Sequence, residues 1–331
     1  MKKLLLSSFA MTSLFIMTAC SNETETTTKK EETVQTSKKG NNETSNTNPQ
    51  DFYKELSSGN IDHIHGIGYA GNIPGISIAT HSGIRIYQDG KWLETPVQKH
   101  DYMGFQATKD GFFASGHPEP GSKLKNPLGL TKSVDGGETL KTLAFYGESD
   151  FHNLAVGYNN EAIYVYNERP NSKLKTGFYF SKNSGTDWES SKLDGISSTI
   201  SSFAVHPDKA SIIAISAKDG IHLSTDYGNT FQIFSKSEGT TALTFGNEEI
   251  IYSHTTNKKQ QGLTKQLLAN GEKTELQVPP LHTKEAIMYI SQNPQNPSEI
   301  VFVTSEVSVF LTTDNGQTWK QIVEKGTLQF N

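Results

Sequence analysis

Histidine and carboxylate side chains are concentrated in one part of this 331-residue sequence. Six of the ten histidines lie between residues 63 and 152. Three pairs of polar or metal-ligating residues are spaced two apart: His63 and His65, Asp101 and Met103, and Asp150 and His152. Because successive side chains of a β-strand point to opposite faces, each pair would share one face of its strand. We therefore expect three neighbouring strands to present such pairs at one level.

A second set of polar residues ends the apolar runs that follow these pairs: His81, His117 and Glu168. The start of a strand lies beside the end of its antiparallel neighbour, so we expect both sets to meet at one end of their sheets. Imidazoles with carboxylates suit zinc, and a nearby thioether suits copper. The pattern predicts a metal site formed by His63, His65, His81, Asp101, Met103, His117, Asp150 and His152, with Asp62, Glu119 and Glu168 on its rim.

A repeated turn indicates how these strands are arranged. Four segments approximate the pattern Ser/Thr-x-Asp-x-Gly-x-Thr-Trp: Ser133–Leu140, Ser181–Trp188, Ser224–Phe231 and Thr312–Trp319. The Asp (or Asn) positions of successive segments are 48, 43 and 88 residues apart. Degenerate copies of the pattern lie at Asp89–Trp92 and Asn270–Gly271. A period of about 40 to 50 residues is typical of a β-propeller. We therefore predict an all-β, six-bladed propeller with each turn between the third and fourth strands of its blade.

Local chemistry explains the turn. The Asp carboxylate can accept hydrogen bonds from backbone N–H groups of its own turn, the Gly can take a left-handed conformation, and the aromatic side chain can fill the gap between sheets. The pattern resembles the Asp box of sialidases, sortilin-type receptors, certain endoglucanases and a plant photosystem assembly factor.

Several short segments also resemble those of a group of bacterial surface lipoproteins that are labelled sortilin-like or glycosyl-hydrolase-like. The resemblance covers most of residues 61–320 and is most specific at Asp62–Gly66, Ala79–Gly83, Asp101–Phe105, Ser115–Pro118, Leu128–Leu130 and Asp150–His152. The label implies a hydrolase, but Asp boxes report a fold rather than a chemistry.

The N-terminus has the features of a lipoprotein signal peptide. Lys2 and Lys3 precede a largely apolar stretch over residues 4–17, and Met17-Thr18-Ala19-Cys20 resembles a bacterial lipobox. Cys20, the single cysteine, is therefore the expected lipidation site. Residues 20–50 are polar enough to form a disordered tether. We predict a signal peptide over 1–19, a lipidated linker over 20–50 and the propeller over 51–331, held on the extracytoplasmic face of a bacterial cell membrane.

Composition narrows the function. The formal net charge is −5 and the chain has two arginines, Arg85 and Arg169, so nucleic acid is not an expected partner. Sialidases hold the substrate carboxylate with three arginines, and because this chain has only two, sialidase activity is excluded.

A different glycosidase remains an alternative, with Asp101 and Asp150 as paired carboxylates. A protein- or peptide-binding propeller is a third possibility, and a water-filled polar channel is the plainest account of the cluster. Metal binding without catalysis is the preferred hypothesis. Thr327–Phe330 could pair with the first blade, although the segment is too short to decide this.

Overall fold

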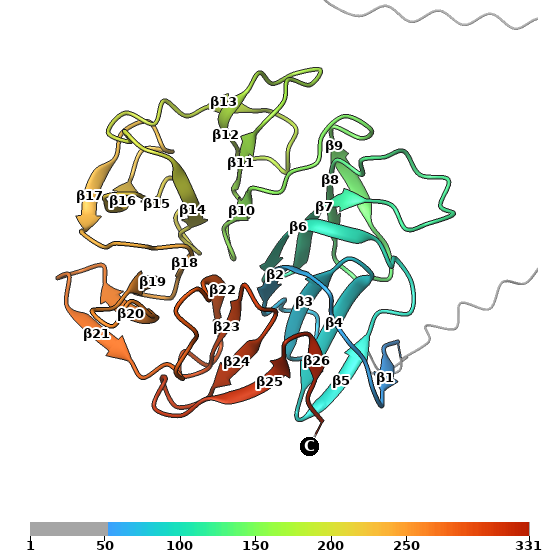
Figure 1. Ribbon diagram of the computed structural model, residues 1–331. Coiled ribbons are helices and arrows are strands. Elements are labelled where there is room, and N and C mark those ends of the chain that lie inside the picture. The colour runs from blue at the N-terminus through green and yellow to red at the C-terminus, as the bar shows by residue number, and fades with distance from the viewer. Residues whose placement is uncertain (1–51, 331) are drawn as a thin grey trace, which may run out of the picture. The chain divides into compact units, whose positions relative to one another are not determined.

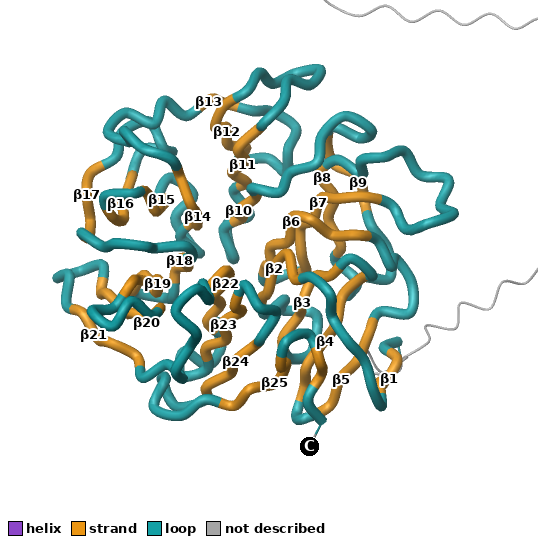
Figure 2. Tube along the Cα trace, in the orientation of Figure 1, coloured by secondary structure: helices purple, strands orange, loops and turns teal. Residues whose placement is uncertain are grey.

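A computed structural model describes residues 52–330. The predicted signal peptide, the Cys20 lipidation site and the linker lie outside the described residues. Within residues 52–330 the regular elements are strands (Figure 2), and no helix is long and apolar enough to span a bilayer.

The strands form six antiparallel sheets that stand as blades around a central axis (Figure 1), which confirms the prediction of a six-bladed, all-β fold. Four strands of every blade follow one another in chain order from the axis outward. The innermost strands are β2 (Ile64–Gly68), β6 (Asp101–Thr108), β10 (Leu154–Val156), β14 (Ile200–Val205), β18 (Leu243–Phe245) and β22 (Ile287–Gln292). The second strands are β3 (Ile76–Thr80), β7 (Gly111–His117), β11 (Ile163–Asn167), β15 (Ile213–Ala217), β19 (Glu249–Thr255) and β23 (Ile300–Thr304).

The outer half of each blade completes the sheet. The third strands are β4 (Gly83–Gln88), β8 (Leu130–Ser133), β12 (Gly177–Ser181), β16 (Gly220–Ser224), β20 (Gln261–Leu267) and β24 (Val309–Thr312). The fourth strands are β5 (Lys91–Glu94), β9 (Lys141–Ala144), β13 (Glu189–Ser190), β17 (Gln232–Ser235), β21 (Lys273–Leu276) and β25 (Lys320–Glu324). Two short strands extend blades one and six: β1 (Lys54–Leu56) pairs with β5, and β26 (Thr327–Leu328) pairs with β25.

The core lies between the blades rather than at the axis. The second strands are apolar on both faces because each face meets a neighbouring sheet. In β23, Val301 and Val303 pack toward blade one, whereas Ile300 and Phe302 pack toward blade five. This alternation follows from the two-residue period of a strand. Six such apolar layers hold the ring together.

The four repeated turns have the hydrogen bonds that their sequence predicts. Asp314 Oδ1 accepts from the backbone N–H groups of Gln317 (3.0 Å) and Thr318 (2.9 Å), and the Thr318 hydroxyl donates to Asp314 Oδ2 at 2.6 Å. Asn315 and Gly316 are both left-handed, with φ of 59° and 81°. The turn therefore needs a residue that tolerates positive φ followed by glycine.

Blade three keeps the same geometry with its partners exchanged. Asn183 Oδ1 accepts from the backbone N–H of Asp187 at 2.9 Å, and Asn183 Nδ2 donates to Asp187 Oδ2 at 2.8 Å. In the Asp314 turn the carboxylate accepts from the Thr318 hydroxyl, whereas here the Asn183 amide donates to the Asp187 carboxylate. Replacing the Asp–Thr pair by Asn–Asp therefore preserves both contacts. The aromatic that ends the turn packs between sheets: Trp188 lies 5.6 Å from the Phe145 ring.

The ring closes through the C-terminal segment. The Ile61 N–H donates to the Gly326 carbonyl at 2.7 Å, and the Leu328 N–H donates to the Gly59 carbonyl at 3.1 Å. Trp92 Nε1 donates to the Gln329 carbonyl at 2.9 Å. The C-terminal segment thus continues blade six and is joined to the chain just before blade one.

The repeated turns should make the fold sensitive to acid. Hydrogen bonds from the Thr318 hydroxyl and backbone N–H hold the pKa of Asp314 down at about 2, against an ordinary value of 3.8. A lowered carboxyl pKa stabilises the fold above the unfolded-state pKa, and this contribution is lost as the pH falls from about 4 to about 2. We expect Asp314→Ala to lower the melting temperature at neutral pH and to reduce the further loss on acidification. Thermal denaturation at several pH values measures both. Asp110→Ala, in an exposed turn, is the control, and an unchanged acid profile for Asp314→Ala would contradict this account.

Candidate metal centre

The predicted ligands lie at one mouth of the channel, where innermost strands begin and second strands end. His63 directly precedes β2, His65 lies within it, and His81 directly follows β3. In blade two, Asp101 is paired across the sheet with His117. The structure therefore brings together side chains that are up to 89 positions apart in the sequence, from His63 to His152.

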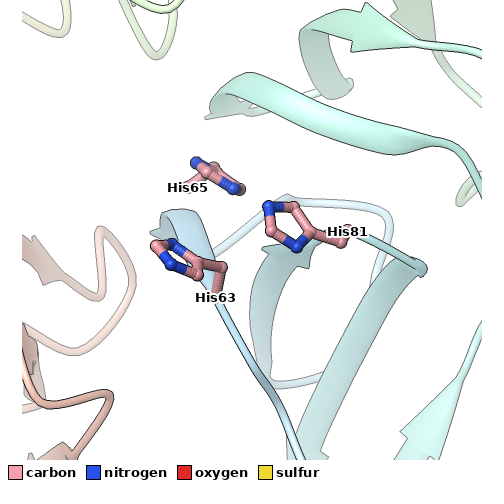
Figure 3. A group of neighbouring side chains, drawn as sticks. All are labelled: His63, His65 and His81. Atoms are coloured by element: carbon pink, nitrogen blue, oxygen red, sulfur yellow. The ribbon is translucent and has the colours of Figure 1, made fainter.

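The imidazoles of His63, His65 and His81 form a compact group (Figure 3). Their ring centroids are 4.8 to 5.5 Å apart, and one nitrogen from each lies within 4.8 Å of the others. His81 Nδ1 lies 3.3 Å from Asp62 Oδ2, and His81 Nε2 lies 3.9 Å from Asp101 Oδ1. Two ligand atoms bound to one zinc at about 2.0–2.2 Å can be at most about 4.4 Å apart. To bind one ion together, the three rings would have to rotate so that their nitrogens come closer and converge.

Burial keeps His65 in the form that binds metals. Desolvation is the largest cause that lowers its pKa, to about 4, and the neighbouring His81 adds to the effect. Its ring is consequently neutral at pH 7. His65 Nε2 and Asp101 Oδ1 are buried atoms without a hydrogen-bond partner among the described residues. Buried polar atoms are normally paired, so these two are available to a ligand.

A second group lies around Asp150 in blade three. Asp150 Oδ2 is 3.2 Å from His117 Nε2 and 3.4 Å from His152 Nδ1. His117 is oriented from its other side by Asn126 Oδ1, 2.6 Å from Nδ1. Burial raises the pKa of Asp150, and the charges of Asp101 and Glu168 act in the same direction, while the two histidines oppose it. Asp150 Oδ1 is also buried without a hydrogen-bond partner.

The remaining predicted residues lie at varying distances from these groups. Met103 lines the central channel cavity together with His65 and His152. Glu168 borders the Asp150 group, where its Oε1 accepts from Asn153 Nδ2 at 3.1 Å. The backbone of Glu119 donates to His100 Nδ1 at 3.0 Å, which associates this residue with a buried histidine that was not among the predicted ligands.

Sequence reasoning missed several neighbours. Asn126 comes from the long β7–β8 insertion, and nothing local in the sequence links it to His117. A third group, in blade six, is made of His282, Glu285 and Glu306, although the Glu306 carboxylate is already 3.4 Å from Lys325 Nζ.

Four of the six innermost strands carry a one-residue bulge at this mouth. Register shifts fall at His65, Met103, Ser201 and Met288 in blades one, two, four and six. The pairing in blades three and five has no such shift. There the Tyr166 N–H donates to the Asn153 carbonyl and the Ser253 N–H to the Ala242 carbonyl, so His152 and Thr241 directly precede the first bonded residue and hold the equivalent position. A bulge redirects side chains. All six residues line one central cavity of about 370 Å³.

Glycines next to two bulges let neighbouring blades approach closely. A Cβ on Gly104 would lie 2.2 Å from the Phe151 carbonyl oxygen, and one on Gly66 would lie 2.8 Å from Phe105 Cβ. Neither contact is sterically allowed. The spacing between the innermost strands therefore depends on these glycines.

No family model matches the sequence, and no curated protein does. Solved structures show similarity of fold. The extracellular domain of BT4673, assigned to a one-component system of B. thetaiotaomicron, superposes with a TM-score of 0.50 at 10% identity, covering 82% of this chain and 34% of that one. An ancestral GH74 enzyme gives 0.49 at 11% identity, covering 82% and 40%. YCF48 bound to the D1 peptide gives 0.47 at 12% identity, covering 83% and 85%.

At 10% identity the likeness to the BT4673 domain concerns the fold alone. The chain spans well under half the length of the BT4673 domain and of the GH74 enzyme. The function has to be argued from the site itself.

The close approach of blades two and three gives a test of the geometry. We expect Gly104→Ala to push the segment Asp150–His152 away from β6 and to destabilise the protein by about 1–3 kcal/mol, as overpacking typically does. Chemical denaturation measures the change. Gly121→Ala adds the same methyl group where nothing lies within 4 Å, although its φ of 82° adds some strain. Equal losses in both variants would show that the close contact is not important.

Proposed function

We propose that this protein is a bacterial lipoprotein, anchored through Cys20 on the extracytoplasmic face of the membrane, whose propeller binds a transition metal at the channel mouth of blades one to three. The lipobox-like sequence supports the anchor. The order of parts would be a signal peptide over 1–19, a tether over 20–50 and an Asp-box propeller over 51–331.

One observation carries the metal proposal: the imidazole nitrogens of His63, His65 and His81 lie within 4.8 Å of one another at the mouth of the channel. Three neighbouring imidazoles without a ligand have little reason to adopt this arrangement, since protonation of any one of them opposes protonation of the others. Asp101 would be the fourth ligand, because its Oδ1 is buried without a hydrogen-bond partner among the described residues and lies 3.9 Å from His81 Nε2. Three imidazoles and one carboxylate suit zinc or copper.

The surroundings of the carboxylates favour binding over glycoside hydrolysis. A glycosidase needs two carboxyl groups that face a scissile bond across open space. Here Asp150 Oδ2 lies between His117 and His152, and Asp101 faces His81. Both carboxylates are thus directed toward imidazoles, which is the arrangement found in metal sites and their supporting shells.

The triad is tested by removing two of its rings. The full-length protein, purified in detergent, should bind zinc or copper(II) with micromolar affinity or better, and His63→Ala/His81→Ala should weaken this by at least about 100-fold, because each lost ligand removes more than 1.4 kcal/mol. At a metal concentration about 100 times Kd, the wild type should gain about 2.7 kcal/mol of stability. Competition with a chromophoric chelator and thermal denaturation measure these effects.

His254→Gln, in blade five, is the matched control and should bind metal normally. If the wild type binds neither ion, the metal proposal fails and a protein or peptide partner over the same mouth takes its place. Turnover of aryl glycosides that disappears in Asp101→Asn or Asp150→Asn would instead establish the glycosidase alternative.

A further inference from the structure

The four bulge residues and the residues at the equivalent positions of blades three and five form a ring around the channel, and their chemistry is divided between its two halves. Going round from blade six, the ring reads Met288, His65, Met103, His152, Ser201 and Thr241. Blades six, one, two and three are contiguous, because β2 contacts both β22 and β6, and β6 contacts β10. Thioethers and imidazoles therefore alternate along one continuous arc, and hydroxyl groups occupy the opposite side.

The two methionines are the feature that needs an explanation. The chain has five methionines, and three of them, Met1, Met11 and Met17, precede the described residues. Both methionines within residues 52–330 therefore occupy the same structural position in different blades. An even scatter of two methionines over about 280 residues would rarely produce this coincidence.

Packing does not account for these methionines. Neither Met103 nor Met288 belongs to any of the six apolar layers described between the blades. Met288 is 42% exposed within a largely polar cavity. Methionine is usually a filler of irregular core space, and here it borders water instead.

One nitrogen on the arc lacks a hydrogen-bond partner among the described residues, whereas a hydroxyl group opposite the arc is engaged. His65 Nε2 is buried and has no hydrogen-bond partner among the described residues. Across the channel, the Thr241 hydroxyl donates to the Ile287 carbonyl at 2.6 Å and so ties blade five to blade six. The buried, unpaired nitrogen of His65 is therefore on the same side of the ring as the two sulfur atoms.

We propose that this arc is a copper(I) site within the channel, formed by the imidazoles of His65 and His152 and the thioethers of Met103 and Met288. Thioethers are soft ligands that select copper(I), and imidazole completes such sites. Zinc prefers thiolate, imidazole and carboxylate ligands and has little affinity for a thioether. The site deepens the proposed function, on which it rests through His65, because that residue belongs to both the rim triad and the arc.

The identity of the ion is tested with methionine-to-leucine changes, which keep bulk and hydrophobicity but remove the sulfur. Full-length protein in detergent is titrated with copper(I) under reducing, anaerobic conditions against bicinchoninate, a copper(I)-specific chelator, and separately with zinc against a zinc indicator. We expect Met103→Leu/Met288→Leu to lower copper(I) affinity by at least about tenfold while zinc affinity stays unchanged. Ser201→Ala, on the opposite side of the ring, should leave both affinities unchanged. X-ray absorption at the copper edge should show sulfur neighbours in the wild type that the double variant lacks.

The outcomes separate the two proposals. If the double methionine variant retains wild-type copper(I) affinity, or loses zinc affinity to the same extent, the arc is not a copper(I) site and the rim proposal stands. Loss of copper(I) binding in Ser201→Ala would also contradict the arc. A wild type that binds zinc but no copper(I) overturns the arc alone. A wild type that binds neither metal overturns both proposals.

Discussion

Crowding of the innermost strands around the axis is the constraint on which the rest of this structure depends. Six sheets can share one axis only if their inner edges approach closely, and in blades one and two this approach passes through Gly66 and Gly104. The accompanying bulges turn one residue of each strand toward the channel. The same crowding thus provides the ring of side chains at the mouth and the short distances between them.

The parts of the fold that local chemistry encodes could be predicted from the sequence. A turn such as Thr312–Trp319 specifies its own hydrogen bonds and left-handed residues, and its period gave six blades with the correct strand order. This inference needs only the geometry of a single turn. The polar pairs do lie near one mouth, but not by sharing a strand face: Asp150 and His152 precede β10, and His63 precedes β2.

What could not be predicted depends on pairing between strands. Met288 escaped notice because a bulge shifts the side-chain alternation by one residue, and the register shift is visible only once β22 and β23 are paired. Ring closure was undecided for the same reason, since the contact between Ile61 and Gly326 joins segments 265 residues apart. Glu119 stays a prediction for the rim, and the bond from its backbone N–H to His100 is a contact that no local pattern indicates.

The two proposed sites would differ in the hardness of their ligands along the channel axis. At the rim, His63 and His81 lie beside the carboxylates of Asp62 and Asp101, a set that suits divalent ions. The bulge ring replaces carboxylate oxygen by thioether sulfur, and its cavity is enclosed by neighbouring blades. His65 belongs to both sets, because it stacks on the rim imidazoles and also lines the cavity. An ion held at the rim would therefore compete with one in the channel for this imidazole, so occupancy of the two sites would be negatively coupled rather than independent.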